Sequence, residues 1–272
     1  MALQVGIHVA VLGEALTREA FERARQAGVD CVEFWVGERG LNPDQPAQIK
    51  RIRDDLRAAG LCISAVHADF DPKLDFGSPY PEARRAGIAA ALLAARLAAE
   101  AGGSMVILHP GAGHVQDEER AQRLRAGRES LEQVLEQSAP LPVRFAVENM
   151  LPGRIGDCAA DLTALLKSLP EGRVGFCYDT GHARLCAEGL EVGRCMGGRM
   201  IAIHLQDNLG ESDDHLMPFD GTLDWALVAR LLDEAGYDGP YMLETAKPTP
   251  EAVVQRASET VRRLRALRGG AL

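Results

Sequence analysis

The sequence predicts a (β/α)8 barrel, in which eight parallel strands alternate with eight helices in one domain over residues 1–272. Short apolar and β-branched runs alternate with longer amphipathic stretches, which is the pattern of a parallel sheet flanked by helices. Eight such pairs fit into 272 residues, and no linker or low-complexity segment marks a domain boundary. This length also lies near the size at which a single hydrophobic core stops growing.

The elements follow in order along the chain. The expected strands cover residues 5–10, 31–36, 62–67, 105–109, 145–149, 175–179, 201–206 and 241–245. The expected helices cover residues 17–28, 44–60, 80–101, 116–138, 157–169, 183–196, 222–236 and 249–268. Capping chemistry marks three helix starts, at Thr17, at Asp157 and at the pair Thr249-Pro250. Ala-Gly pairs end four helices, at 27–28, 59–60, 101–102 and 235–236.

The alternative fold is an open, doubly wound sheet, which usually carries a GxGxxG sequence after its first strand. Here residues 11–15 read ValLeuGlyGluAla and do not match. The sequence also contains no Walker motif and no GxSxG elbow. We therefore favour the barrel and expect no nucleotide cofactor.

Composition and charge narrow the class of protein. Hydrophobic residues make up 46% and charged residues 25%, which is typical of a soluble globular chain. No apolar run is long enough to span a membrane and the start lacks a basic signal segment, so we expect a cytoplasmic protein without a membrane partner. Six scattered cysteines without a CxxC spacing indicate reduced thiols. A net charge of −9 argues against non-specific binding to nucleic acid.

The strongest functional signal is the placement of acidic residues and histidines at the ends of the expected strands. The helices and the strand starts contain almost no histidine. In a barrel of this type, the C-terminal ends of the strands form the mouth in which active sites lie. The groups at the strand ends are His67, His109, Glu148, Asp179, His182, His204 and Glu244, while His8 lies within the first strand.

These groups predict a divalent cation. Glu148 closes the run PheAlaValGlu and Glu244 closes TyrMetLeuGlu, so we expect both to point into the mouth rather than into water. A carboxylate buried in a barrel costs several kcal/mol unless it is paired or bound to a metal. A ring of Glu148, Asp179, Glu244 and several histidines therefore needs a cation at its centre. Asp213 and His215 lie in the loop after the seventh strand and add to the same chemistry.

Four segments carry a resemblance to a known family. They are ValGlyPheCysTyrAspThrGlyHisAla at 174–183, IleAlaIleHisLeuGlnAsp at 201–207, AspHisLeuMetPro with GlyThrLeuAspTrp within 214–225, and GlyTyrAspGlyProTyrMetLeuGlu at 236–244. In this order and spacing the chain resembles the xylose isomerase-like TIM barrel superfamily, over about residues 6–266. That group includes sugar-phosphate and ketose isomerases and epimerases, and the related endonuclease IV. One segment departs from the pattern, because residues 218–222 read ProPheAspGlyThr where relatives often have ProGlyxGly.

The resemblance implies a metal-dependent sugar or sugar-derivative isomerase or epimerase. In the epimerase branch two Glu, one Asp and one His hold the metal, and they map to Glu148, Asp179, His204 and Glu244. Mn, Zn, Co and Mg all suit this mixture of ligands. Glu148 and Glu244 would exchange a proton next to the substrate carbonyl through an enediolate. The remaining assignments are substrate contacts by His67, His109, His182 and His215, and an apolar wall of Trp35 and Phe70.

The alternative is a metal phosphoesterase acting on abasic DNA. The ligands of the trinuclear zinc site of endonuclease IV correspond to residues at nine positions of this chain. Four of them are the metal ligands named above, and the additional ligands would be His67, His109, His182, Asp213 and His215. Residues 37–42 and 69–76 are poor in the basic and aromatic groups that grip and flip DNA, so we expect a small sugar rather than nucleic acid as the partner. A metal-binding barrel without catalysis is a third reading, and a homo-oligomer is compatible with each.

Overall fold

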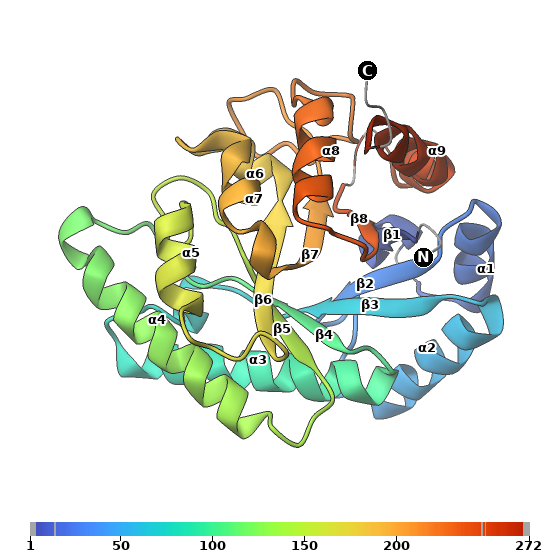
Figure 1. Ribbon diagram of the computed structural model, residues 1–272. Helices are drawn as coiled ribbons and strands as arrows, with labels where there is room; N and C mark the ends of the chain where they lie inside the picture. Colours follow the sequence, from blue (N-terminus) through green and yellow to red (C-terminus); the bar gives the residue numbers. More distant parts are fainter. Residues whose placement is uncertain (1–3, 14, 246, 248, 269–272) are drawn as a thin grey trace.

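The eight expected strands close into one parallel barrel in a computed structural model that describes residues 4–13, 15–245, 247 and 249–268. Neighbours in the barrel are neighbours in sequence, and β1 pairs with β8 to close the ring (Figure 1). The strands are β1 Val5–His8, β2 Cys31–Trp35, β3 Cys62–His67, β4 Met105–Leu108, β5 Arg144–Glu148, β6 Val174–Asp179, β7 Met200–Leu205 and β8 Tyr241–Leu243. The predicted single-domain (β/α)8 fold is confirmed.

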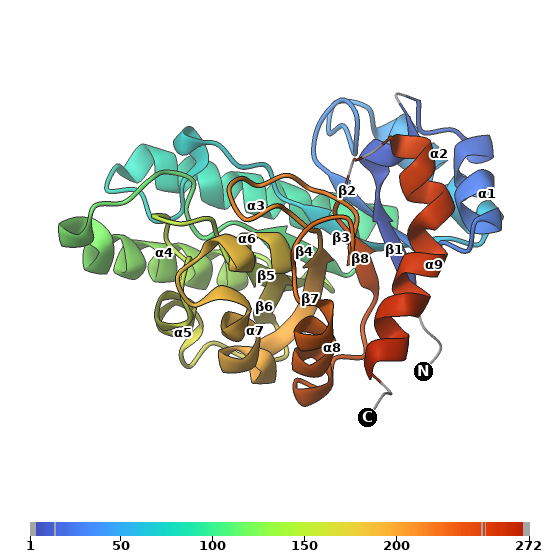
Figure 2. The same cartoon turned by 90° about the horizontal axis from the view of Figure 1, so that it is seen from above.

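Helices surround the barrel, and α9 packs along β1 and α8 (Figure 2). Gly60 and Gly102 end α2 and α3 with the left-handed backbone that the Ala-Gly pairs predict. No helix in the described part of the chain is long and apolar enough to cross a membrane. The helices are α1 Arg18–Gln26, α2 Pro46–Ala59, α3 Pro81–Ala101, α4 Asp117–Gln137, α5 Ala159–Leu166, α6 Thr180–Leu185, α7 Val192–Cys195, α8 Trp225–Glu234 and α9 Pro250–Arg268.

The prediction of one continuous helix over 183–196 is wrong. The chain instead forms α6, a 3-10 turn at Gly189–Glu191 and the short α7. Helix α6 begins at Thr180 because the Asp179 carboxylate caps it, accepting a hydrogen bond from the His182 amide at 2.6 Å. Gly189 has a φ of 58°, a left-handed conformation that a continuous helix does not contain.

The expected caps are confirmed at two helices and wrong at a third. The Thr17 hydroxyl accepts a hydrogen bond from the Ala20 amide at 3.3 Å, and Thr249 caps α9 in the same way. Asp157 does not cap a helix, because Arg120 binds its carboxylate at 2.9 Å and α5 starts two residues later. Strand β1 also ends earlier than expected, at His8, whose Nδ1 accepts a hydrogen bond from the Ala10 amide and opens a 3-10 turn.

Two strands contain an extra residue. Between β2 and β3, Val32 pairs with Ile63 but Glu33 pairs with Ala65, which leaves Ser64 as a bulge. Between β6 and β7 the register also shifts, and Ile201 is the residue left over. The two bulged strands, β3 and β7, carry the expected site residues His67 and His204.

Apolar side chains fill the lower part of the barrel interior. They are small or slender, because eight strands leave little room inside the ring. This layer forms the floor beneath the polar groups at the mouth. Its members are Ala65, Met105, Ile107, Ala146, Cys177 and Ala202.

Candidate functional site

Four of the expected ligands meet at the C-terminal end of the barrel. One ligand atom from each of Glu148, Asp179, His204 and Glu244 lies within 4.8 Å of the others. The His204 Nδ1 atom lies 3.0 Å from Glu148 Oε1, 3.2 Å from Glu244 Oε2 and 4.0 Å from Asp179 Oδ2. We call these four residues the four-ligand cluster: Glu148, Asp179 and His204 lie on β5, β6 and β7, and Glu244 directly follows β8.

The electrostatics of the four-ligand cluster favour a cation. Burial raises the pKa of Asp179 to about 7, and the nearby Glu148 and Glu244 carboxylates act in the same direction. Burial also opposes ionisation of the two glutamates, but the facing imidazoles hold the pKa of Glu148 well below its usual range and lower that of Glu244 to about 2. Asp179 Oδ2 is buried and has no hydrogen-bond partner among the described residues. Three carboxylates, one of which has this orphaned oxygen, and one imidazole fit a divalent ion.

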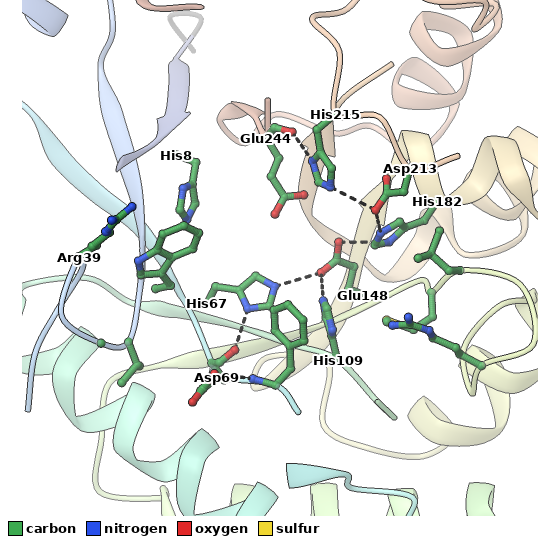
Figure 3. A pocket seen from close by; sticks show the side chains of 18 of the residues that line it. His8, Arg39, His67, Asp69, His109, Glu148, His182, Asp213, His215 and Glu244 are labelled. Carbon is green, nitrogen blue, oxygen red and sulfur yellow. Dashed lines mark hydrogen bonds and ion pairs between the residues drawn. The ribbon is translucent and has the colours of Figure 1, made fainter. Parts of the chain in front are cut away.

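Glu148 also binds two histidines on its other oxygen. His109 Nε2 lies 3.2 Å and His67 Nε2 lies 3.4 Å from Glu148 Oε2, and Figure 3 shows both rings converging on this carboxylate. The Nδ1 of His67 hydrogen-bonds the Ala68 carbonyl at 2.8 Å, which leaves Nε2 to face the site. Burial lowers the pKa of His109 to about 4.

A third group lies on the opposite side of Glu148. The Nε2 atoms of His182 and His215 lie 3.4 Å and 3.2 Å from Asp213 Oδ2. Each ring uses Nδ1 to hydrogen-bond a backbone carbonyl, that of Asn149 for His182 and that of Glu244 for His215. Burial opposes their protonation, but the adjacent carboxylates raise the pKa of His182 to about 10 and that of His215 to about 9.

The loop after β7 carries Asp213 and is organised by a buried carboxylate. Asp207 Oδ1 accepts hydrogen bonds from the backbone amides of Asn208 and Leu223, at 2.9 and 3.1 Å. Asp207 Oδ2 accepts from the Phe219 amide at 3.1 Å and from the Trp225 indole at 2.7 Å. The loop conformation is therefore fixed by one side chain that is fully buried.

The departure at residues 218–222 has a structural counterpart. Phe219 stands where relatives often have Gly, and its φ of 75° lies in the left-handed region that favours glycine. Its ring packs 5.3 Å from Trp225 and lies under the Arg263 guanidinium at 3.8 Å. These contacts hold an aromatic residue in a backbone conformation that glycine adopts without strain.

A pocket of about 680 Å³ opens above these groups. Trp35 and Phe70, the two aromatics expected to form an apolar wall, line it with exposed fractions of 38% and 52%. Arg39 and Arg154 also line it, and sequence reasoning did not single them out. The proposed site residues that line the pocket directly are Trp35, His67, His109, Glu148, His182, Asp213, His215 and Glu244.

Sequence reasoning missed Glu33, a buried acid that contacts the four-ligand cluster. It lies inside the barrel on β2, is 2% exposed and contacts His204 Nε2 at 3.1 Å. A charged residue in the centre of the run CysValGluPheTrp was the available signal. A further acidic cluster, Asp157, Cys158 and Asp161, lies away from the barrel mouth, and Arg120 already neutralises it.

Three uncharacterized proteins are similar to this chain in sequence. Over 276 residues, an uncharacterized protein of Mycobacterium leprae is 26% identical, with 93% of this chain and 92% of that protein covered. An uncharacterized protein of Methanocaldococcus jannaschii is 25% identical over 86% of this chain and 80% of that protein. A match of 38% identity to an uncharacterized protein of Sinorhizobium fredii spans 38% of this chain and 33% of that protein.

Solved structures show the same fold. A D-tagatose 3-epimerase-like protein superposes with a TM-score of 0.81 at 23% identity, covering 98% of both chains. A D-psicose 3-epimerase, solved in the presence of D-fructose, superposes with a TM-score of 0.79 at 15% identity, covering 98% of this chain and all of that one. The family model described as "Xylose isomerase-like TIM barrel" matches residues 21–267. The chain therefore belongs to the xylose isomerase-like TIM barrel family.

Proposed function

We propose that this protein is a divalent-metal-dependent isomerase or epimerase of a sugar or sugar derivative. The observation that carries the proposal is the four-ligand cluster, in which the buried carboxylates of Glu148 and Asp179 and the partly buried carboxylate of Glu244 surround His204 Nδ1 next to a large pocket. So many like charges in a low-dielectric interior repel one another, and a bound cation would compensate them. The fold shared with sugar 3-epimerases supports the same reaction class.

The metal would be held by Glu148, Asp179, His204 and Glu244. A divalent ion held there would polarise a substrate carbonyl and would stabilise the negative charge that develops when a proton leaves the neighbouring carbon. Mn, Co, Mg and Zn are compatible with the donor atoms.

Glu148 and Glu244 have the position and charge for proton transfer. Both line the pocket, and both remain ionised at neutral pH because the facing imidazoles lower the pKa of each. One ionised carboxylate would accept the proton from one face of the substrate, and the other, after taking a proton from water, would deliver it to the opposite face. We assign this exchange to the two glutamates.

The histidines and aromatics around the cluster suit a polyhydroxylated substrate. His67, His109, His182 and His215 line the pocket and offer ring nitrogens to substrate hydroxyl groups. Trp35 and Phe70 offer apolar faces against which a sugar ring or carbon chain packs. We assign these residues to substrate binding.

The proposal is tested by metal analysis and a substrate screen. Chelated protein is reconstituted with Mn, Co, Mg or Zn and incubated with free and phosphorylated ketoses in deuterated water. We expect metal-dependent conversion with deuterium at the carbon next to the carbonyl. Glu148→Gln and Glu244→Gln should each lower turnover by about 10²–10⁴, while Glu211→Gln, an exposed carboxylate on the loop after β7, should not. Near-normal turnover of either pocket variant with metal bound would contradict the two-glutamate assignment.

A second candidate is a metal phosphoesterase acting on abasic DNA. The observation that favours it is the arrangement of His67 and His109 on one side of Glu148, and of His182, Asp213 and His215 on the other. Together with the four-ligand cluster these make three adjoining groups, which suit three ions rather than one. Two or three zinc ions per chain, with incision of abasic duplex that Glu148→Gln abolishes, would replace the first proposal by this one.

A further inference from the structure

Glu33 is a buried acid to which neither proposed function gives a role. It lies in the middle of β2, on the half of the barrel opposite the four-ligand cluster, and is 2% exposed. Among the described residues its hydrogen-bond partner is His204, whose Nε2 bonds Oε2 at 3.3 Å; Oε1 lies 3.1 Å from the same nitrogen, within ion-pair distance, but makes no hydrogen bond. A carboxylate in such a place is retained only if its partner compensates for lost hydration.

The orientation of His204 differs from that of the other histidines at the site. His67, His182 and His215 each hydrogen-bond a backbone carbonyl through Nδ1 and turn Nε2 toward the pocket. The ring of His204 has the opposite orientation. Its Nδ1 atom faces the carboxylates of Glu148 and Glu244, and its Nε2 atom points down into the barrel. No backbone carbonyl of the described residues hydrogen-bonds this Nε2, and Glu33 takes that place.

The chemistry of the pair fixes the tautomer of His204. An ionised carboxylate is an acceptor only, so the nitrogen facing Glu33 must carry the hydrogen. In a neutral imidazole the other nitrogen, Nδ1, then presents its lone pair to the cluster. A negative charge behind the ring also makes the imidazole a stronger metal ligand.

We infer that Glu33 is a positioning residue for the metal: it holds His204 in the Nε2–H tautomer and aims the Nδ1 lone pair at the ion. This inference rests on the metal site of the proposed function. A merely structural ion pair would stabilise the barrel without changing metal affinity, and the two roles therefore separate in experiment.

The test compares three variants of the full chain. Glu33→Gln keeps the shape and one acceptor oxygen but removes the charge, and Glu33→Met removes the acceptor. Ser64→Ala is the matched control, because Ser64 lines the same small cavity as Glu33 but donates its hydrogen bond to the Val32 carbonyl at 3.0 Å. Affinities for Mn²⁺ and Zn²⁺ are measured by competition with a chromophoric chelator, and melting temperatures of the metal-free proteins are recorded alongside.

We expect Glu33→Met to weaken metal binding by about 10–100-fold, the range found when such partners of metal-bound histidines are removed. Glu33→Gln should weaken it by a smaller factor, and Ser64→Ala should leave it unchanged. In the zinc-loaded wild type, ¹⁵N-histidine spectra should place the His204 proton on Nε2, with the signal assigned by its loss in His204→Gln. If Glu33→Met does not fold, the metal affinity of Glu33→Gln and the spectra of the wild type still test whether Glu33 positions His204.

Three results would overturn the inference. The first is unchanged metal affinity in the Glu33 variants, and the second is equal weakening in Ser64→Ala. The third is a His204 proton on Nδ1 in the zinc-loaded protein. A wild-type protein that binds no divalent metal would overturn the proposed function itself, and this inference with it.

Discussion

Replacing Asp207 by Asn should destabilise the protein strongly, although the two side chains have nearly the same shape. Each carboxylate oxygen accepts two N–H hydrogen bonds, and the residue is fully buried. An asparagine keeps one acceptor oxygen and places an NH₂ group where the other stood. Whichever way the amide is turned, two N–H donors of the protein then face the NH₂ group of the asparagine instead of an acceptor oxygen.

The size of the effect follows from these two lost acceptors. A buried donor left without a partner costs about 1–3 kcal/mol, so Asp207→Asn should lower the free energy of unfolding by about 2–6 kcal/mol. This is a large part of the roughly 5–15 kcal/mol that keeps a domain folded. The assay is equilibrium urea unfolding followed by circular dichroism.

A double-mutant cycle tests the hydrogen bond between the Trp225 indole and Asp207 Oδ2. Trp225→Phe removes one of the two donors on Asp207 Oδ2, so Asp207→Asn should cost about 1–3 kcal/mol less in that background than in the wild type. An Asp207→Asn variant within about 1 kcal/mol of the wild type, or an equal cost in both backgrounds, would refute the account of this loop.

Three further predictions concern metal, pH and thiols. Chelation should lower the melting temperature, and adding Mn or Zn at about 100 times its Kd should restore about 2.7 kcal/mol; the absence of any shift would count against a metal site. In metal-free protein the raised pKa values of His182 (about 10) and His215 (about 9) add stability that is fully present below about pH 6.5 and is lost as pH rises through 9 to 10. Urea unfolding between pH 6 and pH 10 should show this decline, and His182→Asn should flatten it. A hydrogen bond with the Cys31 thiol lowers the pKa of Cys62 to about 7. Cys62 should therefore react with an aromatic disulfide reagent at pH 7 faster than exposed Cys195 does. Cys31→Ala should abolish that difference in rate.

The fold and most of the site were predictable from the sequence because both depend on local patterns. Strand β3 runs from Cys62 to His67 as expected, and its last residue is one of the strand-end groups. Parallel strands bring their C-terminal ends to one mouth, so a list of strand-end acids and histidines was sufficient to group the site.

Glu33 was missed for a physical reason. It sits in the middle of its strand, so a search limited to strand ends passes over it. Its partner His204 is 171 residues away in sequence, and no local pattern encodes that contact. Only the closure of the barrel brings the two side chains together.

Errors at helix boundaries have two origins. Asp157 has the residue type of a helix cap, but Arg120, on a different helix, binds its carboxylate. Asp179 ends an expected strand, and its Oδ1 also caps α6, so this helix begins at Thr180 rather than at residue 183. A tertiary partner decided the first case, whereas a local cap was overlooked in the second.

The two bulges decide which side of the barrel wall two of the histidines occupy. If Ser64 stood opposite Glu33, as in an unbroken ladder, Val66 would stand opposite Trp35 and His67 would project outward among the helices. The extra residue Ile201 has the same effect on β7, where an unbroken ladder would set Ile203 opposite Asp179 and turn His204 out of the barrel. Each bulge therefore changes the parity of its strand, and the cluster at the mouth exists only with the parity that these two irregularities produce.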